Sequence, residues 1–134
     1  MSPTRIHHIN FVVHDLDAAI ARYEQKLNLD SFVIVEHPLR GARVARTKVG
    51  SCWLVLVCPY DAESIPGRYL AEHGEGFFLF SLGVADLAQT IEQLTADGIE
   101  CIDKTARAGI LDWQVADIGD LHGAQVQLTE DTTG

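Results

Sequence analysis

The chain has 134 residues, of which 47% are hydrophobic and 22% are charged, a composition typical of a globular domain. Its formal net charge of -9 would repel nucleic acid and anionic membrane surfaces, so we expect neither as a partner. We also expect no signal peptide and no membrane-spanning helix, because no segment has the length and apolar character that either needs.

The first half of the chain predicts a strand, a helix and three further strands. Residues 5–13 are rich in strand-forming residues, and Asp15 follows them as the expected N-cap of the helix. An apolar stripe at helical spacing supports this helix and consists of Leu16, Ile20, Tyr23 and Leu27. The further strands are expected at about 31–37, 42–49 and 51–58.

The second half predicts the same order of elements after a linker over 59–75. Within the linker, a short helix is expected at 66–73. A strand is predicted at 76–84, and Asp86 is the expected cap of the next helix, with Gln89 placed for a capping box. The apolar stripe of this helix consists of Leu87, Ile91 and Leu94. Shorter strands are expected near 99–102, 111–117 and 123–129.

The two halves of the chain repeat one pattern. Asp15-Leu16 falls on Asp86-Leu87 when the sequence is shifted by 71 residues, from 15 to 86. A repeat of this length indicates two similar modules. We therefore predict an α+β fold in which one domain over 1–134 contains two tandem βαβββ modules, 5–58 and 76–130, related by a pseudo-twofold. One helix should cover one side of each sheet and leave the concave side free.

The cysteines indicate a reducing compartment. Cys52 and Cys58 stand on one predicted strand, roughly 20 Å apart along it, which is beyond the reach of a disulfide. With Cys101, they make an odd count of 3. Both observations favour reduced thiols and a cytoplasmic location.

The residue pattern resembles a known superfamily. I-H-H-I-N-F-V-V-H-D-L-D at 6–17, G-S-C-W-L-V-L-V at 50–57 and G-E-G-F-F-L-F-S-L-G at 74–83 are similar to the vicinal oxygen chelate superfamily. This group includes glyoxalase I, extradiol dioxygenases, bleomycin-resistance proteins and methylmalonyl-CoA epimerase. The resemblance covers 5–130, and the E-H-G-E-G run at 72–76 makes the pattern most similar to the epimerase branch.

The resemblance implies a cup-shaped site that holds a divalent metal. In the superfamily, the ligands come from the first and the last strand of each half, and the chain has His8, Val55, Leu79 and Gln127 at these positions. In the epimerase branch, a carboxylate base stands where this chain has Val44. Valine and leucine offer no metal ligand, so we expect no bound metal and no cofactor.

Strand alternation indicates what the cup holds instead. His8 is the candidate catalytic group, because a histidine base is suited to neutral pH. The candidate ligand-binding residues are Asn10, Arg46, Trp53, Val55, Phe77, Leu79, Gln125 and Gln127. An apolar wall with a few convergent polar groups is the usual composition of a small-molecule pocket. The other histidines are expected at strand edges or in loops and are His7, His14, His37, His73 and His122.

Three functions remain open. The first is the binding of an apolar or aromatic small molecule, as in bleomycin-resistance proteins, and Trp53 and Phe77 favour it. The second is a metal-independent isomerase or lyase with His8 as the base. The alternative is a divalent-metal-dependent lyase or isomerase of the glyoxalase or methylmalonyl-CoA epimerase type.

Two further expectations concern the cup and the assembly. The apolar side chains could instead fill the cup, but His8, Asn10 and Gln127 would then need buried hydrogen-bond partners. A homodimer is expected, because sheets of this superfamily leave edge strands and apolar surface that a second copy covers.

Overall fold

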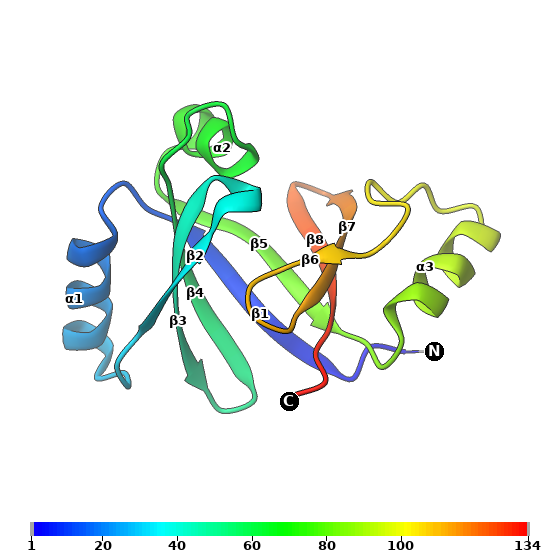
Figure 1. Ribbon diagram of the computed structural model, residues 1–134, viewed down its shortest axis with the longest axis horizontal. Helices are drawn as coiled ribbons and strands as arrows, with labels where there is room; N and C mark the ends of the chain where they lie inside the picture. Colours follow the sequence, from blue (N-terminus) through cyan, green and yellow to red (C-terminus); the bar gives the residue numbers. More distant parts are fainter. Residues whose placement is uncertain (1, 134) are drawn as a thin grey trace. The chain divides into compact units, whose positions relative to one another are not determined.

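The computed structural model describes residues 2–133 and has an α+β fold (Figure 1). The chain forms two compact units. The first unit comprises residues 8–78, and the second unit comprises residues 79–133 together with residues 2–7. One boundary therefore falls inside strand β1 (Arg5–Val12) and the other inside strand β5 (Gly76–Gly83), so each of these strands contributes residues to both units.

The first unit has a sheet with the strand order β2-β3-β4-β1. Its other elements are α1 (Leu16–Leu27), β2 (Val33–His37), the 3-10 helix η1 (Pro38–Arg40), β3 (Ala42–Val49), β4 (Cys52–Pro59) and α2 (Ile65–His73). β4 is parallel to β1 and antiparallel to β3. As predicted, Asp15 caps α1, and its Oδ1 accepts a hydrogen bond from the Ala18 backbone N–H at 3.0 Å.

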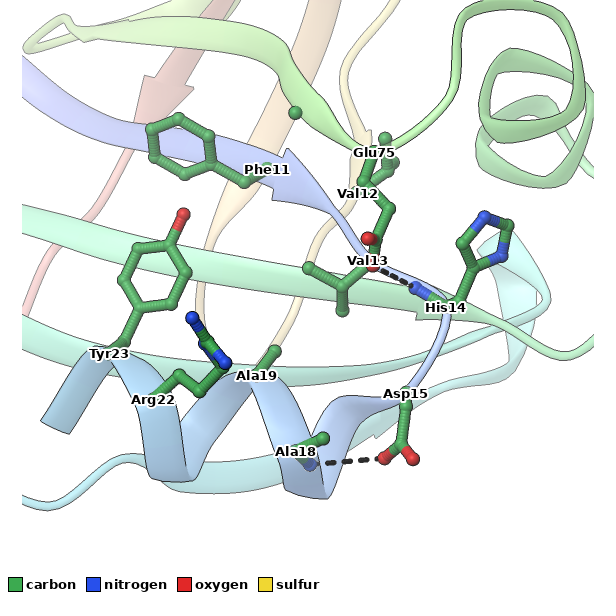
Figure 2. A pocket seen from close by; sticks show the side chains of 11 residues that line it. Phe11, Val12, Val13, His14, Asp15, Ala18, Ala19, Arg22, Tyr23 and Glu75 are labelled. Carbon is green, nitrogen blue, oxygen red and sulfur yellow. Dashed lines mark hydrogen bonds between the residues drawn. The ribbon is translucent and has the colours of Figure 1, made fainter. Parts of the chain in front are cut away.

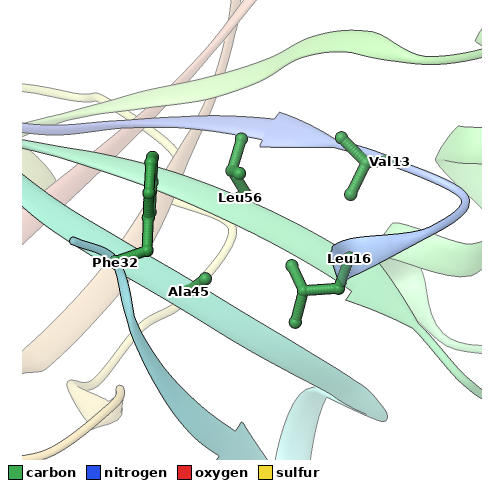
Figure 3. Close-up of a cluster of buried hydrophobic side chains, with 5 residues drawn as sticks. All are labelled: Val13, Leu16, Phe32, Ala45 and Leu56. Carbon is green, nitrogen blue, oxygen red and sulfur yellow. The ribbon is translucent and has the colours of Figure 1, made fainter. Parts of the chain in front are cut away.

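The core of the first unit lies between α1 and the sheet. A buried cluster there consists of Val13, Leu16, Phe32, Ala45 and Leu56 (Figure 3). Phe11 and Leu54 pack against this cluster from β1 and β4. Since side chains alternate along a strand, the even-numbered residues of β1 and the odd-numbered residues of β4 face away from α1. We call this opposite surface of the sheet the α1-distal face.

The second unit repeats the arrangement with the strand order β5-β8-β7-β6. Its elements are β5 (Gly76–Gly83), α3 (Leu87–Ala96), β6 (Arg107–Ala108), β7 (Gln114–Leu121) and β8 (Ala124–Glu130). Asp86 caps α3, and its Oδ1 accepts from the Gln89 backbone N–H at 3.0 Å. Its core cluster consists of Val84, Leu87, Ile91, Ala116 and Leu128. Residues 81, 127 and 129 alternate with members of this core and form the α3-distal face.

The strand predicted near 99–102 is wrong. These residues form no strand, and β7 pairs instead with the two residues of β6. Ile102 and Asp103 donate backbone N–H groups to the carbonyls of Ile118 and Asp117, at 3.1 and 2.9 Å, but the ladder does not continue. The Asp117 backbone N–H donates to the Asp103 carboxylate, at 2.7 Å from Oδ2, and not to a backbone carbonyl. A side chain thus satisfies the donor to which a neighbouring strand would bond.

The predicted α+β fold of two successive βαβββ modules is confirmed by the order of the elements. No helix formed by residues 2–133 is both long enough and apolar enough to cross a membrane.

Candidate functional site

The α1-distal face of the first unit carries most of the predicted site residues. Strand register sets them in rows across β3, β4 and β1. The first row is Lys48, Trp53 and His8; the second is Arg46, Val55 and Asn10; the third is Val44, Val57 and Val12. The face therefore changes from three valines at one end to aromatic and polar groups at the other. This gradient suits a ligand with an apolar body and a polar group.

His8 and Asn10 supply the polar groups on β1. His8 is buried, with 2% of its surface exposed. Asn10 is half-buried, and its Oδ1 is shielded from solvent without accepting a hydrogen bond. A buried acceptor without a partner costs free energy, and a ligand or a water molecule that donates to it removes this cost.

Trp53 lies in a cationic environment. The Arg46 guanidinium carbon is 3.9 Å from the centre of the Trp53 ring, and Lys48 Nζ is 5.1 Å from it. Both distances are within the range of a cation–π interaction. These contacts hold the ring in one orientation, and they place two positive charges where a negatively charged ligand group could bind.

The α3-distal face of the second unit carries Gln127 and Leu79. Gln127 is 5% exposed, and its Nε2 donates to Asp117 Oδ1 at 3.0 Å. Its Oε1 is buried and accepts no hydrogen bond. Beside it, Ser81 Oγ and Thr129 Oγ1 form a fully buried hydrogen bond of 2.5 Å. The prediction that Gln127 and Leu79 share a cup with His8 and Val55 stays a prediction.

The residues at the four superfamily ligand positions do not fit a divalent metal. Val55 and Leu79 are 2% and 3% exposed, and their side chains carry no donor atom. Among residues 2–133, no group of three or more histidine, cysteine, aspartate or glutamate side chains could hold a metal ion. A divalent ion needs several nitrogen, oxygen or sulfur ligands, and His8 and Gln127 are too few.

Phe77 and Gln125, two of the predicted ligand-binding residues, are not buried. The Phe77 ring meets the Phe11 ring edge-on, at 6.3 Å between centres, and Phe11 packs toward α1. Phe77 is 40% exposed, so it contributes apolar surface that a ligand or partner could cover. Gln125 is half-buried on β8, where it pairs with Asp120 of β7.

A buried histidine–carboxylate pair lies in the second unit and was missed by the sequence interpretation. His7, expected at a strand edge or in a loop, is instead 0% exposed. Its Nε2 is 2.7 Å from Asp131 Oδ2, and its ring packs edge-on against Trp113 at 4.5 Å. Burial raises the pKa of the Asp131 carboxyl, but hydrogen bonds from His7 and Thr133 outweigh this effect and lower the pKa to about 2. No sequence pattern links positions 7 and 131.

A groove of about 490 Å³ opens on the α1 side of the first unit (Figure 2). Phe11 of β1 and Val13, which directly follows β1, form its apolar wall, and Tyr23 and Arg22 approach from α1. The carboxylate of Glu75 accepts the His14 backbone N–H at 2.9 Å and fixes one end of the groove. The groove includes none of the predicted site residues, and of the residues in the three rows of the α1-distal face it shares only Val12.

Comparison with known proteins identifies the superfamily. Residues 7–116 match the sequence model of the glyoxalase/bleomycin resistance protein/dioxygenase superfamily. This match covers most of the chain, and the protein belongs to this superfamily. No curated protein matches the chain significantly.

The solved structures that resemble the chain include methylmalonyl-CoA epimerases. One is in complex with methylmalonyl-CoA and NH4+, with 27% identity, a TM-score of 0.91, and coverage of 98% of this chain and 96% of that chain. A variant of the Streptomyces coelicolor enzyme, in complex with 2-nitronate-propionyl-CoA, gives the same four values. The Mycobacterium tuberculosis enzyme has 26% identity, a TM-score of 0.91, and coverage of 97% and 89%.

Proposed function

We propose that this protein binds an apolar or aromatic small molecule without the help of a metal ion. In the first unit, the ligand would lie against Trp53 and Val55 and be oriented by His8, Asn10 and Arg46. In the second unit, the proposed ligand-binding residues are Leu79, Gln125 and Gln127. Phe77 would add aromatic surface.

The observation that carries this proposal is the composition of the α1-distal face. The Trp53 ring stands in the same row as His8, and the buried Val55 stands in the same row as Asn10. The buried Asn10 Oδ1 accepts no hydrogen bond within the described chain. A polar atom that has lost contact with water and gained no partner supports a face built to receive a donor from outside the chain.

The alternative of a metal-dependent lyase or isomerase has less support. Val55 and Leu79 put hydrocarbon at two of the four ligand positions that the superfamily uses. A carboxylate base is also missing from the row that contains Val44.

A second candidate function is a metal-independent isomerase or lyase. The likeness to methylmalonyl-CoA epimerases favours it, and His8 is the group that could move a proton. An imidazole that accepts a proton from the carbon next to a thioester carbonyl becomes an imidazolium and leaves an enolate. Exchange of the imidazolium proton with solvent before its return would then label that carbon. Exchange of that proton in D2O, followed by NMR with methylmalonyl-CoA or propionyl-CoA, tests this activity. If His8 is the base, His8→Ala should slow the exchange by about two to four orders of magnitude.

Trp53 provides the test of binding. We expect 4-tert-butylphenol, an apolar aromatic probe, to change the tryptophan fluorescence and to raise the melting temperature of the protein. The only other tryptophan is Trp113, which is buried against His7 in the second unit. Trp53→Phe should therefore abolish the fluorescence change, while the signal of Trp113 remains as an internal reference.

Matched variants decide which surface binds the probe. Asn10→Leu and His8→Ala should each weaken binding several-fold. Arg22→Ala, which alters the groove beside α1, should leave the affinity unchanged. If Arg22→Ala weakens binding and Asn10→Leu does not, the ligand site is the groove and the proposal is wrong. If a panel of aromatic acids, phenols and acyl-CoAs gives neither signal, a filled cup is the better account.

We further propose a cytoplasmic homodimer. Cys52, Cys58 and Cys101 are not joined in disulfides, in keeping with a reducing compartment. β2 is the edge strand of the first unit's sheet, and its Val33 and Ile34 are exposed. Apolar side chains on an edge strand favour pairing with a second copy. A monomer in sedimentation equilibrium at micromolar concentration would contradict the dimer.

A further inference from the structure

We propose that Asp117 and Arg107 fix the side-chain amide of Gln127 so that its Oε1 selects ligands that donate a hydrogen bond. The inference rests on the proposed function, since it assigns a role to one of its ligand-binding residues. It also names the chemical class of the ligand group: a hydroxyl, an amide N–H or an amine, and not a carboxylate.

The orientation of the Gln127 amide follows from its neighbour. Asp117 and Gln127 are cross-strand partners on β7 and β8, and Gln127 Nε2 is 3.0 Å from Asp117 Oδ1. A carboxylate only accepts hydrogen bonds, so the NH2 group of the amide must face it. Turning the amide over would set two oxygens against each other. Oε1 is consequently held on the side away from Asp117.

Asp117 is itself held at several points. Arg107 Nη2 donates to Asp117 Oδ2 at 2.9 Å, and Arg107 Nε is 3.3 Å from Asp103 Oδ2. The same Asp103 oxygen accepts the Asp117 backbone N–H at 2.7 Å. A register shift of β7 between Asp117 and Gly119 breaks the ladder here, a feature that often re-aims a side chain. The two oxygens of Asp117 thus have separate partners, and one of them is the amide of Gln127.

Gln127 Oε1 is the group left to bind a ligand. The residue is 5% exposed, and this oxygen accepts no hydrogen bond from the described residues. A ligand donor would restore the hydrogen bond that burial has removed. A ligand carboxylate would instead be disfavoured, because both it and Oε1 only accept hydrogen bonds. Asp117 and Arg107 are positioning residues in this scheme, because they act through Gln127.

The first arm of the test needs no ligand. In 15N NMR spectra, the Gln127 NH2 signals are identified by their loss in Gln127→Leu. We expect these protons to exchange slowly with solvent, and Asp117→Asn to accelerate their exchange at least severalfold. Asp112→Asn, the same change at an exposed position of this unit, should have no effect. Arg107→Lys serves as a second variant and should shift the exchange in the same direction by a smaller amount.

The second arm compares two probes that differ in one hydrogen-bond donor. 4-tert-Butylphenol carries a hydroxyl, and 4-tert-butylanisole carries a methyl ether in its place. Wild-type protein should bind the phenol about tenfold more tightly, the value expected for one buried hydrogen bond. Gln127→Leu should remove most of this preference without weakening the anisole. Asp117→Asn should reduce it several-fold, since an asparagine no longer dictates which end of the amide faces it.

The outcomes separate the two proposals. Equal affinities for both probes in wild-type protein would overturn the inference and leave the proposed function standing. A preference for the phenol that Asn10→Leu removes and Gln127→Leu leaves would do the same, because the single hydroxyl would then donate to Asn10 Oδ1. Binding of neither probe would overturn the proposed function. Unchanged amide exchange in Asp117→Asn and Arg107→Lys would overturn the positioning role, whatever the probes do.

Discussion

Replacing Asp131 by asparagine should destabilise the protein in a way that depends on pH. The Asp131 carboxylate is paired with the fully buried His7, and its pKa is lowered from 3.8 to about 2. A carboxyl whose pKa is lowered in the folded state stabilises the fold above the unfolded pKa. The contribution is lost as the pH falls through the folded pKa, so the window of change runs from about 4 down to about 2.

The magnitude follows from the shift. A change from 3.8 to about 2 corresponds to about 2 kcal/mol in the free energy of unfolding at pH 6. At pH 3 the same linkage leaves about 1 kcal/mol, because the carboxyl of the unfolded chain is already protonated. Asparagine resembles the protonated acid in shape and is neutral at every pH. The difference between wild type and Asp131→Asn should therefore shrink by about half between pH 6 and pH 3.

Urea unfolding at pH 6, 4.5 and 3 measures this difference. Asp112→Asn provides the control, since Asp112 is exposed and should give a difference near zero at each pH. A destabilisation in Asp131→Asn that is constant over the three pH values would refute the reasoning. It would mean that the lost contact is one of packing and not of charge.

Two further predictions concern packing. Ser81→Ala should lower the free energy of unfolding by about 1–3 kcal/mol, because it leaves the Thr129 hydroxyl buried without its partner. Adding Thr129→Val should recover part of this loss. If chemical denaturation shows that the two substitutions have strictly additive effects, the hydrogen bond between them is contradicted. Gly67→Ala should destabilise by about 1–3 kcal/mol, because a Cβ there would lie 2.2 Å from the Asp61 carbonyl oxygen, and an unchanged melting temperature would show that the start of α2 shifts freely.

Local chemistry explains which parts of the fold could be predicted. Asp15 and Asp86 each precede an apolar stripe of helical spacing, and both act as N-caps in the structure. These signals lie within a few residues of one another and depend on no distant partner. The strand predicted near 99–102, which does not form, depended on a contact outside its own segment. It depended on whether Asp117 would bond to a backbone carbonyl or to the Asp103 carboxylate, and no local pattern decides that.

The candidate site was predictable in composition and not in its supporting contacts. Strand alternation, with His8 and Val55 set facing inward by the superfamily resemblance, put His8, Asn10 and Trp53 on one face. The residues that hold or polarise the site are distant in sequence, such as Asp117, 10 positions from Gln127 across a strand pair. The His7–Asp131 pair spans 124 positions. Such pairs arise from register and topology, which the sequence of one chain does not encode locally.

Calorimetric titration of 4-tert-butylphenol into protein treated with EDTA tests the central claim most directly. We predict binding of about one molecule per chain, with a dissociation constant that changes by less than about twofold when one equivalent of Zn2+ or Co2+ is added, since hydrocarbon stands at two of the four ligand positions. The same titration with Asn10→Leu should show several-fold weaker binding. Binding that appears only after the metal is added would contradict a metal-independent site on the α1-distal face.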